Sequence, residues 1–156
     1  MDMFKFARAQ EIRAEQTYRD CATHATDPSL KEVFTLLADA EKNHLAIIQQ
    51  LERQNPSRVA TSVLLERSRD LLQRLAPDKP ALRAAQSRVD VYQEAQRQEK
   101  EARTFYQEKA QEAADPVTRE IFLALANQEH EHFQVLDWLI DLIRTPDLEN
   151  AEFNRR

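Results

Sequence analysis

Apolar residues recur at steps of three and four along most of this chain, the spacing that places side chains on one face of an α-helix. In residues 2–25 the apolar face carries Phe4, Ala7, Ala14, Tyr18 and Ala25. Residues 28–54 show the same period. Asp27-Pro28 separates the two segments, because Asp is a favoured N-cap and Pro suits the first helical position. The pattern predicts two long helices joined by a tight turn.

The second half of the chain repeats this arrangement after a connecting segment. We predict a shorter amphipathic helix over residues 58–76, then long helices over 80–113 and 116–143, with Asp115-Pro116 between them. A connection of this length can cross from one end of a helical bundle to the other. We therefore expect one domain over residues 1–144, with 55–80 as the crossover. Residues 145–156 are a polar tail, expected to be loose or used in packing between subunits.

An internal duplication relates the two halves at a constant offset of 88 residues (129 − 41 = 88). Shifting the chain by this offset pairs Tyr18 with Tyr106 and Phe34 with Phe122, and no gap is needed. Each half is therefore expected to form a helical hairpin. The predicted fold is an all-α four-helix bundle, built from two duplicated hairpins with a long, partly helical crossover.

Composition supports this fold and narrows the function. The chain has no Gly, which β-turns need, and it is rich in residues that favour helices. A net charge of −5 argues against nucleic acid as a partner, which usually requires a basic face. No apolar run approaches the ~18 residues of a membrane span, so we expect no membrane partner.

Cys21 is the only cysteine. A single thiol cannot form an internal disulfide or a cysteine-based zinc or iron–sulfur site. We interpret Cys21 as a small core residue rather than a reactive thiol. This cysteine usage fits a reducing cytoplasm, which is the compartment we expect.

Four glutamates and two histidines interrupt the apolar faces of the long helices. They are Glu11, Glu41, His44, Glu99, Glu129 and His132. Residues three apart lie on one side of a helix, so each Glu-x-x-His can direct a carboxylate and an imidazole at one metal ion. Four carboxylates offset the charge of two divalent ions. Ferritin-like di-iron and di-manganese bundles have this ligand set: two helices provide one glutamate each, and the other two provide a Glu-x-x-His each. We predict two metal ions, bridged by two of the carboxylates and capped by the other two.

Each of the six residues has an ordinary structural alternative. A single Glu can be a surface charge on a misjudged face, and a single His can be a hydrogen-bonded core residue. The matched positions of all six favour a metal site, because four buried carboxylates without metal would repel one another and would have to take up protons.

Other polar residues near these positions have two interpretations. Tyr18 and Tyr106 share the helix faces of Glu11 and Glu99, so they can donate hydrogen bonds to ligand carboxylates or simply pack in the core. Glu15 lies one turn from Glu11 and can reach the site. The residues expected to be exposed are His24, His130, Glu15 and Glu101.

From Phe4 to Ile143 the chain resembles the rubrerythrin group of the ferritin-like superfamily. The motifs are Glu11-x-x-Ala14-x-x-x-Tyr18, then Phe34-x-x-Leu37-Ala38-x-x-Glu41-x-x-His44, and the matching set from Glu99 to His132. The resemblance implies a ferritin-like four-helix bundle with a non-haem di-iron site, held by the six residues above. It implies reduction of hydrogen peroxide, with ferrous iron oxidation and reaction with oxygen as related activities, and it implies a homodimer.

Two features depart from the rubrerythrin pattern. Many rubrerythrins carry a C-terminal rubredoxin domain with a four-cysteine iron site, and this chain has one cysteine, so we expect electrons from a separate donor protein. Rubrerythrins also tend to carry a further carboxylate three residues after the glutamate of the third long helix. That carboxylate is associated with peroxidase behaviour, and Ala102 occupies its position. Peroxide and oxygen therefore both remain open as the oxidant.

The leading hypothesis is a di-iron oxidoreductase acting on hydrogen peroxide or oxygen, with manganese or zinc as alternative metals. A second hypothesis is an iron-binding or iron-handling protein without turnover, which would use the same six ligands. A third is a helical interaction module with a degenerate site. Repeated turnover with an added reductant separates the first two, and the response of thermal stability to Fe(II) separates the third.

Overall fold

The computed structural model describes residues 2–145, and all regular structure in that range is helical. Four long helices dominate: α1 (Met3–His24), α2 (Pro28–Glu52), α5 (Val89–Glu112) and α6 (Pro116–Arg144). The shorter elements are α3 (Leu64–Leu75), α4 (Lys79–Ala85) and a 3-10 helix, η1 (Gln86–Arg88). The predicted tail lies outside the described residues except for Thr145. Within the described residues, every helix is too short or too polar to span a membrane.

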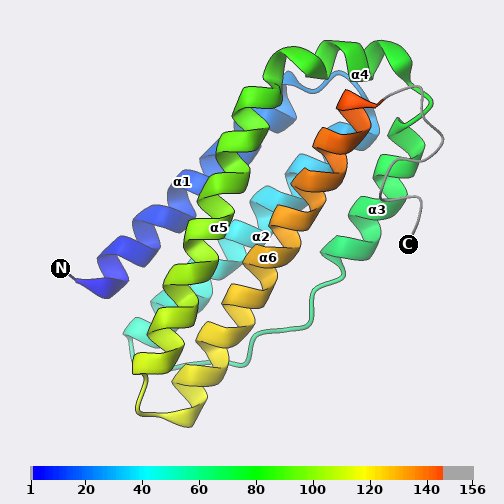
Figure 1. Cartoon of the computed structure of the whole chain (residues 1–156). Helices are drawn as coiled ribbons and strands as arrows, with labels where there is room; N and C mark the ends of the chain where they lie inside the picture. The colour runs from blue at the N-terminus through cyan, green and yellow to red at the C-terminus, as the bar shows by residue number, and fades with distance from the viewer. Residues whose placement is uncertain (1, 146–156) are drawn as a thin grey trace.

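The long helices form two antiparallel hairpins, α1–α2 and α5–α6, which pack together as a four-helix bundle (Figure 1). Within the bundle α1 contacts α5 and α2 contacts α6. The predicted breaks are confirmed. Asp27 Oδ1 accepts hydrogen bonds from the Ser29 and Leu30 amides, at 2.7 and 3.2 Å, and Asp115 accepts one from the Thr118 amide. Each Asp caps a helix whose first residue is Pro, so the turn chemistry of the two halves is the same.

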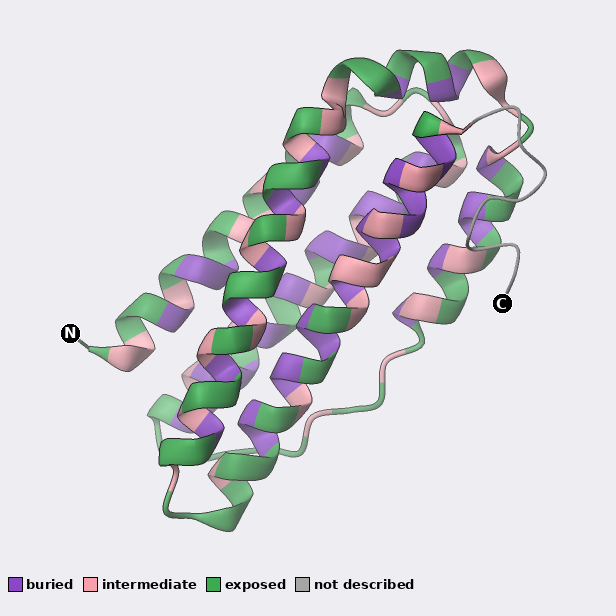
Figure 2. Cartoon of the chain, in the orientation of Figure 1, coloured by how far each residue is buried: buried purple, intermediate pink, exposed green. Residues whose placement is uncertain are grey.

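Hydrophobic side chains form two clusters at different levels of the bundle, and burial follows the inner helix faces (Figure 2). One cluster includes Tyr18, Phe34 and Tyr92 and lies at the end covered by α3 and α4. The other includes Ile48 and Phe122 and lies towards the α5–α6 turn. In every long helix, the predicted Glu and His positions fall between the residues of these two clusters. The fold therefore places one polar layer between two apolar ones.

The crossover differs from the prediction of a helix over residues 58–76. The structure is irregular from residue 54 to 63, after Gln54 adopts a positive φ of 59° at the end of α2. Helix α3 begins only at Leu64, and Val63, expected on the apolar face, is 61% exposed. Residues 55–62 offer little apolar surface to bury, so tertiary packing does not stabilise a helix there. The irregular stretch runs along the lower end of the bundle before α3 packs against α2 and α6 (Figure 1).

The prediction of one continuous helix over residues 80–113 is also wrong. Helix α4 crosses the end of the bundle, and η1 turns the chain into α5 (Figure 1). None of the three η1 residues is buried, and the Ser87 hydroxyl donates to the Ala84 carbonyl at 3.0 Å. Such side-chain bonds to the backbone offer an alternative to regular helix. The bend lets Leu82 of α4 cover the end of the core, which a straight helix would leave uncovered.

Candidate metal centre

The six predicted residues lie together in the middle layer of the bundle. Helix α1 provides Glu11 and α5 provides Glu99, while α2 and α6 each provide a Glu and a His three residues apart. All six side chains are at most 3% exposed. The ligand atoms form two groups of four, each within 4.8 Å: Glu11, Glu41, His44 and Glu129 in one, and Glu41, Glu99, Glu129 and His132 in the other. A third group of three, His44, Glu129 and His132, lies across the two. Because Glu41 and Glu129 belong to both groups of four, the arrangement has the form of two adjacent sites with two shared carboxylates.

The histidines reach across the pseudo-symmetric halves rather than towards their own helix alone. His44 Nδ1 lies 3.0 Å from Glu129 Oε1 and 3.5 Å from Glu11 Oε2. His132 Nδ1 lies 2.5 Å from Glu41 Oε1 and 3.6 Å from Glu99 Oε1. The two imidazole rings stack with their centroids 5.4 Å apart. Each half-site therefore combines residues from both copies of the duplicated hairpin.

The ligand atoms that face one another have no hydrogen-bond partners. They are Glu11 Oε2, both Glu41 oxygens, Glu99 Oε2, Glu129 Oε1, His44 Nδ1 and His132 Nδ1. The close Nδ1–oxygen pairs thus lack hydrogen-bond geometry in spite of their short distances. A buried polar atom without a partner costs about 1–3 kcal/mol. Mixed carboxylate and imidazole donors converging on one point are the donor set of a divalent transition metal, so the residues fit a bound metal pair.

Tyrosine hydroxyls hold the two unshared glutamates. The Tyr18 hydroxyl donates to Glu99 Oε1 at 2.7 Å, and the Tyr106 hydroxyl donates to Glu11 Oε1 at 2.6 Å. Each tyrosine thus bonds the glutamate of the opposite half. Each hydroxyl occupies one carboxylate oxygen and leaves the other free for a metal, as expected of residues that orient ligands. Both rings also lie in the apolar clusters, so the packing role applies as well.

The two shared carboxylates are poised to carry protons in the absence of metal. Burial raises the pKa of Glu41 well above its usual 4.5, and the charges of Glu11, Glu129 and Glu99 add to the effect. Burial together with the charges of Glu11 and Glu99 raises the pKa of Glu129 to about 7. Repulsion among carboxylates in one dry layer is the physical cause. A divalent cation would remove that repulsion.

The neighbouring charges raise the pKa values of both histidines and lower that of Glu11. Burial opposes the charged form of His44, but the Glu11 and Glu129 carboxylates outweigh it and raise its pKa well above 6.5. The pKa of His132 is raised in the same way, with Glu99 and then Glu129 outweighing burial. Burial alone would raise the pKa of Glu11, yet the charge of His44 and the hydrogen bond from the Tyr106 hydroxyl lower it. Metal binding would therefore displace protons from both histidines.

Gln128 is a buried residue of this region that the sequence analysis missed. Its Oε1 lies 2.7 Å from His44 Nε2, and its amide nitrogen donates to the Ala60 carbonyl of the crossover at 3.0 Å. Because Oε1 only accepts, neutral His44 carries its hydrogen on Nε2, which leaves the lone pair of Nδ1 for a metal. The position 88 residues earlier is Ala40. Comparing polar residues between the two halves therefore could not identify Gln128. Its position directly before Glu129 was the one feature of the sequence that pointed to a place near the ligands.

The polar residues expected in solvent are placed as predicted. His24 and His130 are exposed, and the half-buried Glu15 pairs with Arg19 at 3.0 Å instead of joining either ligand group. Glu101 forms an exposed ion pair with Arg97. Cys21 is buried with a free thiol, and burial raises its pKa, as expected of a core cysteine.

Comparison with known proteins agrees with the geometry. A model of the Rubrerythrin family matches residues 2–140, which include most of the bundle and all six residues of the polar layer. Comparisons with curated proteins and with solved structures gave no match. The family match, the all-helical bundle and the buried Glu/His layer agree with one another. The chain belongs to the rubrerythrin family.

Proposed function

We propose that this protein is a di-iron oxidoreductase that reduces hydrogen peroxide or oxygen, with electrons from a separate donor protein. The observation that carries the proposal is the pair of overlapping ligand groups that share Glu41 and Glu129. Two sharing carboxylates would hold two metal ions close enough to act on one small molecule. A structural ion would need only one such group.

We propose iron as the metal, because the chain belongs to the rubrerythrin family. Each group offers three carboxylates and one imidazole, and mixed oxygen and nitrogen donors suit iron, with manganese or zinc as alternatives. When bound, a reduced iron pair supplies the two electrons that convert peroxide and two protons into two molecules of water. The same two electrons and two protons convert oxygen into peroxide.

The protein's own groups have three tasks in this chemistry. The two tyrosine hydroxyls fix the outer glutamates, Glu11 and Glu99, so that each presents one free oxygen. Gln128 fixes the tautomer of His44. The apolar clusters on either side of the layer exclude bulk water, which strengthens the electrostatic interactions within it. The shared carboxylates, whose pKa values are raised, can hold protons whenever metal charge is low.

The first test is the amount of iron bound per chain after anaerobic Fe(II) loading and desalting. We expect about two ions in the wild type, as in other bundles with this ligand set. His132→Ala should lose at least one ion, whereas the exposed Glu101→Ala should lose none. A wild type that retains almost no iron would overturn the proposal.

The second test separates turnover from storage. Loaded protein is mixed with repeated additions of peroxide or oxygen in the presence of a chemical reductant, and oxidant consumption is compared with that of an equal amount of free Fe(II). An oxidoreductase continues to consume oxidant over many cycles. Consumption that stops after one oxidation would instead identify an iron-handling protein without turnover.

A further inference from the structure

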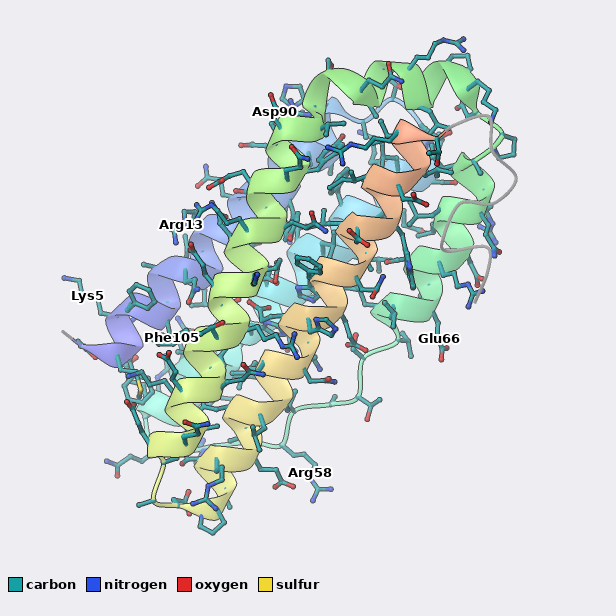
Figure 3. The ribbon with its side chains drawn as sticks, in the orientation of Figure 1. Lys5, Arg13, Arg58, Glu66, Asp90 and Phe105 are labelled. Carbon is teal, nitrogen blue, oxygen red and sulfur yellow. The ribbon has the colours of Figure 1, made fainter. Side chains whose placement is uncertain are left out.

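A cavity of about 110 Å³ lies between α5 and α6, the two helices at the front of the view in Figure 3. It is lined by Glu99, Lys100, Arg103, His130 and Phe133, and we call it the vestibule. Lys100 and His130 are exposed, so the vestibule opens at the surface. Glu99 is only 3% exposed and belongs to the polar layer, so it forms the inner end. The vestibule thus connects solvent with one outer glutamate of the candidate metal centre.

Apart from the Glu99 carboxylate at its inner end, the polar groups of the vestibule wall are hydrogen-bond donors. Arg103 Nη1 donates to His130 Nδ1 at 3.1 Å, because a guanidinium has no acceptor. Neutral His130 therefore carries its hydrogen on Nε2, where it is a further donor. Lys100 adds an ammonium group, and the Phe133 ring stacks on His130 with centroids 6.2 Å apart. Such a wall attracts a small acceptor or anion and repels a metal cation.

The vestibule has room inside it for a ligand of a few heavy atoms. A water molecule takes up about 30 Å³ in the liquid, so about 110 Å³ corresponds to a handful of waters. Peroxide, oxygen and small inorganic anions fit this volume. An organic substrate of ordinary size does not.

The duplicated half does not repeat this chemistry. The positions that correspond to Lys100, Arg103, His130 and Phe133 at the offset of 88 are Ile12, Glu15, Lys42 and Leu45. An acidic residue, Glu15, thus stands where the vestibule has Arg103, and it is paired with Arg19. The donor wall is therefore a property of the α5–α6 side and is not a by-product of the duplication.

The seam between α1 and α5 is a narrower rival route. A cavity of about 10 Å³ there is lined by Gln10, Arg13, Ala14, Gln98, Glu99, Ala102 and Glu129. That volume is below the room needed for one water molecule, about 10–15 Å³, or at best equal to it. Further along the same seam Phe105 packs against Phe6, with ring centroids 4.9 Å apart (Figure 3). The vestibule offers more room.

We propose that the vestibule is the access and holding site for the small oxidant, where Arg103, Lys100 and His130 bind a peroxide-sized acceptor before it reaches the Glu99 side of the centre. This inference rests on the proposed function, because it requires a metal pair behind Glu99. It gives the α5–α6 face a role in selecting the substrate, which the metal-ligating residues do not have. It also predicts that ferrous ions enter elsewhere.

Azide tests the inference without turnover, since it is a small anion whose binding to oxidised iron changes the visible absorbance. Stopped-flow mixing of azide with iron-loaded, oxidised protein gives the association rate at low and high salt. In Arg103→Gln we expect a rate about tenfold lower at low salt, with a weaker salt dependence, because a charged cleft raises on-rates by about 10–10³. His130→Trp, which fills the vestibule, should slow azide further. Lys42→Gln removes a positive charge at the position that corresponds to His130 and should leave the rate unchanged.

Iron content and melting temperature are measured for each variant, and both should match the wild type, since Arg103 is half-buried and His130 exposed. If Arg103→Gln and His130→Trp keep normal iron and the normal azide rate, the inference is overturned. If Ala102→Val slows azide while these two do not, the route lies in the α1–α5 seam and the inference is also overturned. Failure of the wild type to bind iron would instead overturn the proposed function, so the two failures are distinguishable.

Discussion

Glu41→Gln should stabilise the metal-free protein and abolish the stabilisation that metal provides. Glu41 has no exposed surface, neither of its side-chain oxygens has a hydrogen-bond partner, and three other carboxylates face it. A glutamine has nearly the same shape, carries no charge and can donate its amide hydrogens to those carboxylates.

The size of the effect follows from burial and from mass action. Relieving one unpaired buried group is worth about 1–3 kcal/mol. For a chain of this length, 1 kcal/mol corresponds to roughly 2–4 °C in melting temperature. Metal at a hundredfold excess over its Kd stabilises the wild type by about 2.7 kcal/mol for each site. The variant should therefore melt several degrees above the wild type without metal, and below it once Fe(II) or Mn(II) is added.

Thermal unfolding followed by circular dichroism, with a chelator and then with anaerobic metal, measures both effects. Glu101→Gln is the matched control. It removes an exposed carboxylate paired with Arg97, so it should change stability by no more than about 0.5 kcal/mol and leave the metal response intact. The reasoning is refuted if Glu41→Gln is less stable than the wild type without metal, or if it still gains the full stabilisation from metal.

Four further predictions concern the ligands and the groups around them. Gln128→Leu should weaken metal binding about 10–100-fold at the position beside His44, as loss of an orienting partner usually does; two equal binding steps in a metal titration would contradict this. Tyr106→Phe should lower the free energy of unfolding by about 1.5–3 kcal/mol, the value of a hydrogen bond to a charged carboxylate, while keeping two metal ions; denaturant unfolding and metal analysis test both parts. The stability of the metal-free protein should fall as pH rises through about 7. Glu129 and the two histidines have raised pKa values in the folded protein, so their contribution to the free energy of unfolding is present below their ordinary pKa values and is lost above the raised ones. Glu11, with a lowered pKa, acts in the opposite direction but is outnumbered. Since metal must displace protons, the gain in melting temperature on adding metal should grow from pH 5.5 to 8, and a shrinking gain would contradict the assignment.

Several features of the fold were predictable because they depend on neighbouring residues. The helix starts at Pro28 and Pro116 follow from Asp-Pro, whose capping chemistry acts within three residues. The buried positions of Glu11 and Glu41 follow from the helical period, which places them among apolar side chains. The duplication supported the prediction of these buried positions, because the same helix face carries a Glu or His among apolar residues in both halves.

The predictions from sequence that were wrong concern segments whose conformation depends on residues far away in the chain. In residues 58–63, Val59 packs against the cluster of Ile48 and Phe122 but Val63 is exposed, and the helix begins at Leu64 instead. The bend between α4 and α5 exists because Leu82 must cover the end of the bundle, and the local period of the sequence continues through it without a mark.

The sequence by itself placed four glutamates, two histidines and two tyrosines on the inner faces of the long helices. Only the tertiary structure decided that Glu41 and Glu129 are shared, that each tyrosine bonds the glutamate of the opposite half, and that Gln128 links His44 to the crossover. The physical reason is one of range. Helical periodicity is set by residues three and four apart, whereas these contacts join residues 68 or more positions apart, and the packing of one helix on another sets their distance and orientation.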